Sequence, residues 1–263
     1  MHIGLSGVGV VGGTLKKYFE KNTKHTLVCY DPAKDMRDSF DGVEAVFISV
    51  PVFPTRDRQD LGMLTAAVDR AKQFTKNIFV RSTVLPGTND MLGTTAMPEF
   101  LTERRAYEDM CHLPILVGNA HKDFRVDKVF PHKEIIHVSN KEAELTKFTH
   151  NCFGAMKVTY FNIINEICAK IGADYEVVRR ASMLTGFIEE THTQVPGHDG
   201  MFGYGGSCFP GNIRAMTAYL RSEKFVDREY MRDFFEAIHS ANYRYRMITP
   251  LRTIKNKEKE VNA

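Results

Sequence analysis

The sequence has no apolar run long enough to cross a membrane. Its longest, "AVFISVPVF", falls far short of the ~20 residues that a membrane-spanning helix needs. The first residues, "MHIGLSGVGV", also lack the basic region and the small-residue cleavage site of a signal peptide. We therefore expect a cytoplasmic protein with no membrane partner.

Cysteine and net charge are also scarce. The five cysteines form no CxxC pair and no metal-like cluster with histidine, so no metal is expected. A net charge of +3 is too small to indicate nucleic acid or an anionic membrane as a partner. What remains is a globular composition of 263 residues, 43% apolar and 25% charged, enough for one large α/β domain or one domain with a smaller annex.

The first half of the sequence alternates strand-like and helix-like segments. Strands are expected at residues 1–5, 25–31, 45–51, 77–84, 114–118 and 133–139, and helices at 10–22 and 61–74. This alternation predicts an α/β domain over residues 1–140, built as a Rossmann-like, doubly wound parallel sheet with helices on both faces.

The pattern changes at Lys141. Apolar residues recur at steps of three and four over residues 141–172, which predicts one long amphipathic helix with a stripe of Leu145, Phe148, Cys152, Met156, Tyr160, Ile163, Ile167 and Ile171. Lys147 and Asn151 lie one turn apart on the opposite side, where a solvated polar face and a ligand-facing surface are both open interpretations. Helical segments at 174–184, 213–223 and 227–248 complete a predicted small all-α domain over 141–248, and a charged tail follows at 249–263.

A glycine motif, Gly7-x-Gly9-x-x-Gly12, follows the first strand and opens the first helix. Such glycines allow a tight turn, close approach to a pyrophosphate and close helix–strand packing. Asp31 ends the second strand, where a carboxylate holds an adenosine ribose. Asp31 favours NAD because it would repel a 2′-phosphate, whereas Lys34 leaves NADP as an alternative. The other interpretation is a structural strand–helix turn with Asp31 as a surface cap.

Cys208 lies in a long glycine-rich loop, residues 185–211, just before a predicted helix. Unpaired amides at a helix N-terminus stabilise a thiolate, which indicates a reactive cysteine. The alternative is a buried apolar cysteine, our interpretation of the other four. Glu99 and Glu103 in "MPEFLTE" are either site carboxylates or a helix-start acid and a surface acid. Thr83 lies at the carboxyl end of a predicted strand, where open α/β sheets bind ligands.

Together with the glycine motif and Asp31, the segments "STVLPGT", "PEFL", "ELTKFTHN", "NEI", "VPGHDG" and "GYGGSCFPGN" form an ordered series. Over residues 1–248 this series resembles the UDP-glucose/GDP-mannose dehydrogenase family. The resemblance implies a Rossmann domain, a homodimer formed through the long helix, and a UDP-sugar substrate. It also implies oxidation of the sugar C6 alcohol to a carboxylate in two NAD-dependent steps, through a thiohemiacetal and a thioester on cysteine.

The resemblance further implies residue roles. Cys208 would be the nucleophile, and Lys147 would polarise the oxygen at C6 beside Asn151. Thr83 and Glu99 would position a water, and Glu103 would lie by the nicotinamide. The expected cofactor-binding residues are Gly7, Gly9, Val10, Val11, Gly12, Asp31, Lys34, Thr83 and Glu103. The expected substrate-binding residues are Phe100, Leu101, Lys147, Asn151, Phe202, Tyr204 and Gly205.

The sequence departs from the family pattern in two respects. Gly211 and Asn212 stand where the family has Lys-Asp, and Asn212 keeps the shape of the catalytic carboxylate but not its charge. The chain also ends where the family's third domain would begin. Two alternatives therefore stay open: a non-catalytic or weakly active protein that binds NAD or a sugar nucleotide, and a β-hydroxyacid-type dehydrogenase, which would not need Cys208.

Overall fold

The structure, a computed structural model, describes residues 1–55, 58–119 and 124–261. The chain divides into two compact units, each described here by itself. The sheet unit comprises Met1–Phe53 and Gln59–Phe148, and the helical unit comprises Pro54–Arg58 and Thr149–Ala263. The domain limits at residues 140 and 248 that the sequence predicts stay a prediction.

The strands are β1 (His2–Ser6), β2 (Thr26–Asp31), β3 (Met36–Arg37), β4 (Ala45–Ile48), β5 (Phe53–Pro54), β6 (Gln59–Asp60), β7 (Ile78–Val80), β8 (Thr95–Ala96), β9 (Ile115–Val117) and β10 (Ile135–His137). The α-helices are α1 (Val10–Asn22), α2 (Gly62–Lys72), α3 (Thr88–Leu92), α4 (Ala106–His112), α5 (Val126–Val129), α6 (Asn140–Ile171), α7 (Tyr175–Ser182), α8 (Phe209–Tyr219) and α9 (Glu229–Val261). Three short 3₁₀ turns are η1 (Pro32–Lys34), η2 (Glu103–Arg105) and η3 (Glu223–Phe225).

The main sheet has the strand order β3-β2-β1-β4-β7-β8, and its pairs are parallel except for β3, which runs antiparallel to β2. This arrangement confirms the predicted α/β fold. The last two predicted strands, β9 and β10, instead form a parallel pair of their own. The six-stranded sheet ends at β8, which is two residues long. One backbone hydrogen bond, from Gly118 N to Ala96 O at 2.7 Å, joins β8 to the residue that follows β9.

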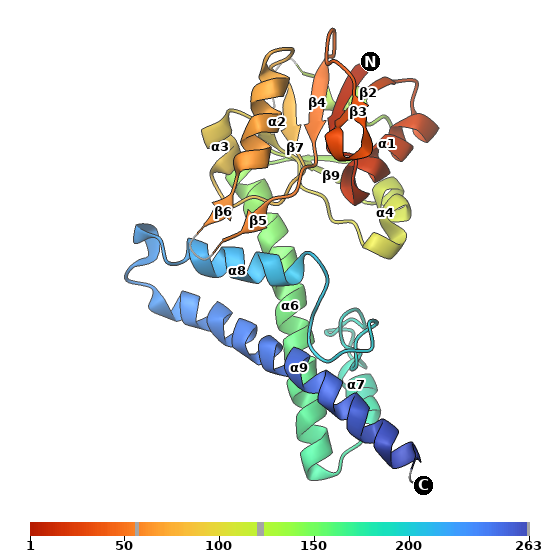
Figure 1. The fold of residues 1–263 in the computed structure, drawn as a ribbon, viewed down its shortest axis with the longest axis vertical. Helices are drawn as coiled ribbons and strands as arrows, with labels where there is room; N and C mark the ends of the chain where they lie inside the picture. The colour runs from red at the N-terminus through yellow and green to blue at the C-terminus, as the bar shows by residue number, and fades with distance from the viewer. Residues whose placement is uncertain (56–57, 120–123, 262–263) are drawn as a thin grey trace. The chain divides into compact units, whose positions relative to one another are not determined.

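Helices cover both faces of the sheet because alternate residues of each strand point to opposite sides. In Figure 1, α1 and α4 lie together on one side and α2 on the other. The first core contains Ile3, Leu5, Phe47 and Phe79 from the strands with Leu15, Phe19 and Met110 from the helices. The second contains Val46, Ile48, Ile78 and Val80 with Leu64 and Val68 of α2. This double cover makes the strands apolar throughout rather than alternating.

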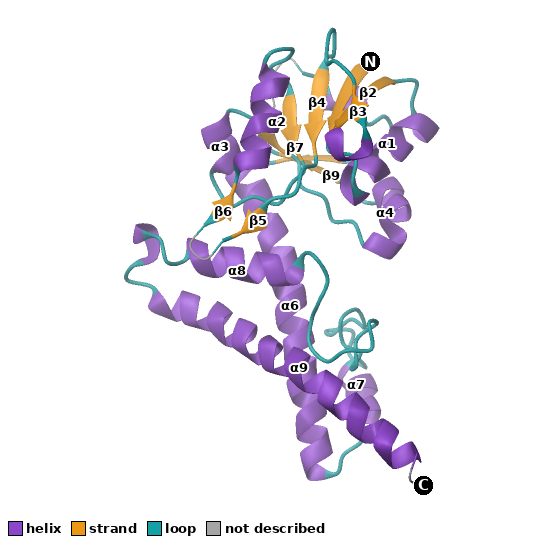
Figure 2. Ribbon diagram, viewed as in Figure 1, coloured by secondary structure: helices purple, strands orange, loops and turns teal. Residues whose placement is uncertain are grey.

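The helical unit consists mainly of α7, α8, α9 and the longer part of α6 (Figure 2). Helix α9 runs from Glu229 to Val261, so the predicted charged tail begins inside a helix rather than after one. Residues 262–263 of that tail lie outside the described part of the chain. Among the described residues, α6 and α9 included, no helix combines the length and the apolarity needed to cross a bilayer.

Helix α6 begins and ends within a residue of its predicted limits, but its faces differ from the prediction. Most of the apolar stripe, including Tyr160, Ile167 and Ile171, is exposed. Lys147 and Asn151 are each 3% exposed, so their interpretation as a solvated polar face is wrong. The reason is that both side chains have polar partners within their own units, which periodicity cannot show.

Candidate functional site

The chain turns sharply after β1, and the three motif glycines serve different purposes there. Gly7 has a φ of +80°, and a Cβ on it would lie 2.8 Å from Ser49 O. A Cβ on Gly12 would lie 1.9 Å from Gly7 O, so no larger residue fits. Gly9, which begins α1, has no atom within 4 Å of a Cβ position. Two glycines therefore close the turn, and Gly9 leaves the helix N-terminus open to an approaching ligand.

This turn lies where the strand order reverses. Gly7 follows β1 and Ser49 follows β4, the two strands at which the sheet extends in opposite directions. Open α/β sheets bind ligands in this crevice, at the carboxyl ends of the strands. The first turn of α1 carries Val10, which is 55% exposed, and Val11, which is half-buried. The predicted cofactor residues Gly7, Gly9, Val10, Val11 and Gly12 therefore come together at a suitable edge of the sheet.

Asp31 and Lys34 lie on the same turn. Asp31 Oδ2 accepts a hydrogen bond from Val8 N at 2.8 Å, and Lys34 Nζ donates to Val8 O at 2.6 Å. Asp31 Oδ1 has no hydrogen-bond partner among the described residues, so it can accept a ribose hydroxyl. The open Gly9, the helix N-terminus and this carboxylate fit a dinucleotide.

A buried ion pair joins α6 to the segment after β8. Lys147 Nζ lies 3.1 Å from Glu99 Oε1, and the two side chains are 4% and 9% exposed. The second oxygen of Glu99 accepts from Leu101 N at 2.6 Å, and the ring of Phe100 lies 5.3 Å from Lys147 Nζ. Buried charges are tolerated when they are paired and hydrogen-bonded in this way. Four residues predicted from the sequence thus meet in the sheet unit.

The Thr83 loop is fixed by two side chains that the sequence analysis did not single out. Gln59 Nε2 donates to Thr83 O at 3.1 Å, and Gln59 Oε1 accepts from Leu85 N at 2.9 Å. Glu144 accepts from Gly87 N at 2.6 Å and from Asn89 N at 2.8 Å. Burial raises the pKa of Glu144, and these bonds oppose that effect. Glu144 precedes Lys147 by about one turn of α6, and this spacing was the feature of the sequence that could have indicated its role.

In the helical unit, Asn151 and Asn212 form a buried amide pair. Asn151 Nδ2 donates to Asn212 Oδ1 at 2.6 Å. His150 Nδ1 lies 3.1 Å from Asn151 Oδ1. Asn212 is held in the first turn of α8 by its own N–H, which donates to Cys208 O at 2.9 Å. The neutral amide therefore has a fixed position at the fourth residue of α8.

Cys208 is the N-cap residue of α8 and is exposed. The next residue, Phe209, packs on α6 so closely that a Cβ on Gly154 would lie 2.5 Å from Phe209 Cζ. By contrast, burial raises the pKa of the Cys152 thiol to about 12, and burial raises the pKa of Cys29 as well. Cys208 thus combines exposure with a helix N-terminus, as a reactive thiol requires.

The glycine loop before Cys208 is held by amide side chains from two helices. Gly203 N donates to Asn162 Oδ1 at 2.9 Å, and Tyr204 N donates to Asn242 Oδ1 at 2.6 Å. Arg246 Nε donates to Tyr204 O at 3.0 Å, and Arg246 Nη2 would lie 1.4 Å from a Cβ on Gly205. Asn162, Asn242 and Arg246 belong to no motif of the sequence. An asparagine in a helix interior is an indifferent helix former, and that was the signal.

Some predicted residues are not gathered with the rest. Glu103 is exposed on η2, whereas Glu99 is buried. Phe202 is half-buried beside the glycine loop. Lys147 and Glu99 belong to the sheet unit, whereas Asn151, Cys208 and Asn212 belong to the helical unit.

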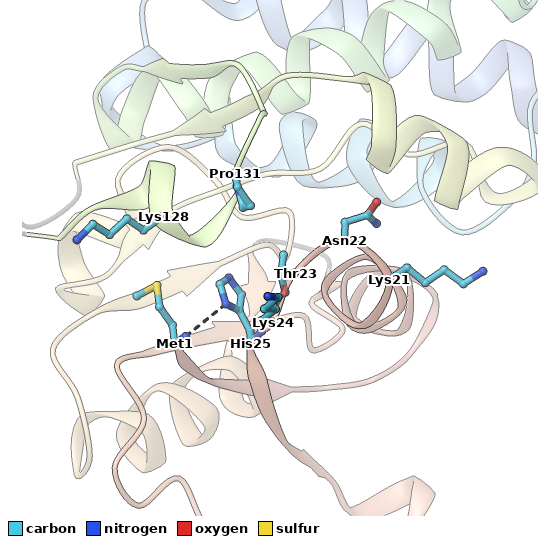
Figure 3. Close-up of a pocket in the computed structure, with 8 residues that line it drawn as sticks. All are labelled: Met1, Lys21, Asn22, Thr23, Lys24, His25, Lys128 and Pro131. Atoms are coloured by element: carbon cyan, nitrogen blue, oxygen red, sulfur yellow. Dashed lines mark hydrogen bonds between the residues drawn. The ribbon is translucent and has the colours of Figure 1, made fainter.

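A cavity of about 600 Å³ lies away from these residues, at the amino-terminal side of β1 and β2 (Figure 3). Its lining includes Lys21, Lys24 and Lys128, and the amino group of Met1 lies 3.4 Å from His25 Nδ1. None of the predicted site residues lines it, and parallel sheets bind ligands at the opposite edge. In the described ranges, no group of three or more His, Cys, Asp or Glu residues is arranged to hold a metal ion.

Comparison with known proteins identifies relatives of this chain. Residues 141–244 match the sequence model of the central domain of the UDP-glucose/GDP-mannose dehydrogenase family. The chain is 28% identical over 212 residues to a UDP-glucose 6-dehydrogenase of Rhizobium meliloti, a match to 70% of this chain and 47% of that protein. It is 26% identical over 241 residues to a UDP-glucose 6-dehydrogenase of Rickettsia bellii, a match to 82% of this chain and 54% of that protein. The chain thus spans about half the length of these curated relatives.

Solved structures show the same fold. A UDP-glucose dehydrogenase from the archaeon Pyrobaculum islandicum matches with a TM-score of 0.77 at 21% identity, over 99% of this chain and 71% of that chain. A GDP-mannose dehydrogenase from Pseudomonas aeruginosa matches with a TM-score of 0.62 at 20% identity, over 93% of this chain and 69% of that chain. The predicted family resemblance and fold are confirmed. Members of this family use NAD, the predicted cofactor.

Proposed function

We propose that this chain, whose residues 141–244 match the central domain of the UDP-glucose/GDP-mannose dehydrogenase family, oxidises the C6 alcohol of a nucleotide sugar with NAD. UDP-glucose, oxidised to UDP-glucuronate, is the first candidate substrate. The observation that carries the proposal is the buried ion pair of Lys147 and Glu99. An ammonium group kept out of water beside one carboxylate is suited to polarise a substrate oxygen.

The cofactor is assigned to the glycine turn. Gly7, Gly9 and Gly12 shape the backbone for the pyrophosphate, and the N-terminus of α1 offers unpaired N–H groups. Asp31 is assigned to the adenosine ribose. NAD, when bound, supplies the hydride acceptor for each of the two oxidations.

The first oxidation requires Lys147 and the water assigned to Thr83 and Glu99. The C6 alcohol loses a proton towards that water and a hydride, and an aldehyde results. Lys147, with Asn151 beside it, stabilises the negative charge that develops on the C6 oxygen.

The second oxidation is assigned to Cys208. Its thiolate adds to the aldehyde carbon, a C–S bond forms, and Lys147 stabilises the resulting oxyanion of the thiohemiacetal. Loss of a second hydride gives a thioester. Water then adds to the thioester carbon and the C–S bond breaks. The carboxylate leaves, the thiolate is restored, and the two protons of the water pass to solvent. Exposure of Cys208 at the start of α8 supports this assignment.

The proposal includes a cytoplasmic homodimer formed through α6. The apolar residues Phe153, Tyr160, Ile163, Ile167 and Ile171 are all exposed along this one helix. Contiguous exposed apolar surface of this kind indicates a protein partner, and a second copy of the chain supplies the same surface.

A second candidate, a weakly active or non-catalytic homologue that binds NAD and a sugar nucleotide, is favoured by Gly211 and Asn212. Asn212 reproduces the hydrogen bond to Asn151 but carries no charge to balance Lys147. Gly211 has no side chain with which to contact a cofactor.

The test is NADH release from NAD with UDP-glucose, GDP-mannose and a small β-hydroxy acid. The proposed function predicts two NADH per UDP-glucose, loss of that stoichiometry in C208S, and strong loss of rate in K147M. K141M is the matched control, because Lys141 lies on the same helix and its side chain is 69% exposed. If calorimetry shows NAD and UDP-glucose binding but no NADH forms, the second candidate holds. If only the hydroxy acid is oxidised, both candidates are wrong.

A further inference from the structure

Arg81 lies directly after β7 with its side chain inside the sheet unit. The residue is 3% exposed, and its backbone N–H donates to Ile48 O at 2.8 Å, which fixes it at the carboxyl edge of the sheet. Its Nη2 lies 4.0 Å from Met110 Sδ. Its Nε and Nη1 have no hydrogen-bond partner among the residues that the structure describes. One charged residue in the apolar run "NIFVRSTV" was the signal in the sequence.

Core stability does not account for this arginine. Moving an ion out of water costs several kcal/mol, and each buried N–H without a partner adds to the cost. Apolar residues of similar size often replace buried ions without loss of stability. Burial lowers the pKa of Arg81 to about 10, and the negative charge of Glu99 opposes that effect. The guanidinium is therefore charged at neutral pH despite its burial.

The surroundings of Arg81 connect it to Glu99. Both residues line one cavity of about 20 Å³, which has room for a single water, and Asp109 of α4 lines it too. Asp109 is already engaged, since it accepts from Thr102 N at 2.7 Å and from Arg105 Nη2 at 3.2 Å. Glu99 in turn pairs with Lys147. Glu99 therefore lies near a second buried cation besides Lys147, and the charges of Arg81 and Glu99 interact across this cavity without a hydrogen bond between the two described side chains.

We propose that Arg81 is a positioning residue that holds the Glu99 carboxylate in place, as a charge, for its contact with Lys147. Lys147 Nζ donates to one oxygen of Glu99 at 3.1 Å, and the other oxygen accepts a hydrogen bond from Leu101 N. A second cation on the cavity side keeps the carboxylate from turning away or losing its charge as a substrate draws on Lys147. The catalytic meaning of this electrostatic interaction rests on the proposed function, whereas the interaction itself can be tested without substrate.

The test is a double-mutant cycle measured by urea denaturation at pH 7, with wild type, E99Q, R81M and R81M/E99Q. E99Q removes the carboxylate that pairs with Lys147 and lies near Arg81, so the ratio of folded to unfolded protein is expected to fall at least tenfold. Adding R81M to E99Q should restore most of the lost stability. In the wild type, by contrast, R81M should not stabilise the protein, because Glu99 is still charged there. R105M is the matched control, because Arg105 pairs with Asp109 from an exposed position, and its effect should add to that of E99Q. If R81M does not fold, R81Q takes its place in the cycle.

Kinetics adds the readout that a merely structural role would not change. R81M should lower kcat for the nucleotide sugar at least tenfold with little change in KM, and R81K should recover part of it. Effects of R81M and E99Q that simply add overturn the proposal whatever the activity. Coupled effects without NADH formation from any nucleotide sugar support the interaction between Arg81 and Glu99 and count against the proposed function instead.

Discussion

Asn212 is an amide at the position where the family resemblance predicts a carboxylate. The structure shows that the amide keeps a hydrogen bond that a carboxylate could also make, but an amide carries no charge. Asn212 Oδ1 accepts from Asn151 Nδ2 at 2.6 Å, as a carboxylate oxygen would. What the amide cannot supply is the negative charge that the proposed function assigns to this position. The loss of a charge-assisted hydrogen bond costs ~1.5–3 kcal/mol, equal to one to two powers of ten in rate when the contact forms in the transition state.

We therefore expect N212D to raise kcat/KM for UDP-glucose by about tenfold or more. The measurement is NADH release at saturating NAD, with N212A as a control that removes both the shape and the hydrogen bond. Equal rates for N212D and wild type would show that this charge is not what limits turnover.

Cys208 should be the thiol that reacts first with an alkylating reagent. It is exposed, while Cys29, Cys152 and Cys168 are buried. Because burial raises the pKa of Cys152 to about 12, its thiolate becomes abundant only as the pH rises towards that value. Mass spectrometry after a short exposure to iodoacetamide at pH 7 should find the label at Cys208 in wild type and little label anywhere in C208S. Faster labelling of Cys111 would contradict the assignment.

The choice between NAD and NADP depends on Asp31. Its carboxylate is held on the glycine turn by Val8 N, and a 2′-phosphate placed there would meet like charge. Calorimetric titration should show NAD binding more tightly than NADP, and D31A should narrow the difference by about tenfold or more. Equal or tighter NADP binding by the wild type would instead assign the leading role to Lys34.

At the scale of elements, the sequence predicted correctly where α6 begins and ends but not which of its side chains are buried. Periodicity locates a helix because one side must be buried, but it assumes that the buried side is apolar. Here Lys147 and Asn151 are buried because each has a partner far away in the sequence, Glu99 and Asn212 respectively. The sequence showed that α6 has an apolar stripe, but it could not show that most of this stripe is exposed.

The candidate site shows the same limit. Motif resemblance predicted roles for Cys208, Lys147 and the glycine turn, since the chemistry expected of them follows from residue type and local setting. Gln59, Arg81 and Asn242 carry no motif, and their roles depend on contacts across the fold, so local patterns could not reveal them.

Gly211 is the third residue of α8. Replacing it by alanine and by lysine distinguishes an effect on helix stability from an effect on cofactor binding. A Cβ on Gly211 would lie 3.9 Å from Pro54 Cγ, an ordinary contact. G211A should therefore stabilise the protein by up to about 1 kcal/mol in urea denaturation. G211K should stabilise it less, because a cation is unfavourable in a first helical turn, yet bind NAD more tightly than G211A. Identical NAD affinities would mean that position 211 does not contact the cofactor.

At the scale of the whole molecule, we expect a homodimer. Light scattering should give twice the chain mass of 29.9 kDa at micromolar concentration. A charge within the exposed α6 stripe, as in I163E/I167E, should give the monomer mass with the circular dichroism spectrum unchanged. V226E is the control, since Val226 is 77% exposed and lies outside α6. A wild-type mass of one chain at every concentration would remove the proposed role of this helix in assembly.

The anchoring of the glycine loop has a consequence for the thermodynamics of binding. Glycine-rich segments lose the most conformational entropy when they become ordered. In this chain Asn162, Asn242 and Arg246 bond to the loop through contacts present in the free protein. The entropic cost of ordering the approach to Cys208 is thus met when the chain folds, not when a sugar binds. The loop is preorganised, and a ligand that reaches it keeps more of its own interaction energy as affinity.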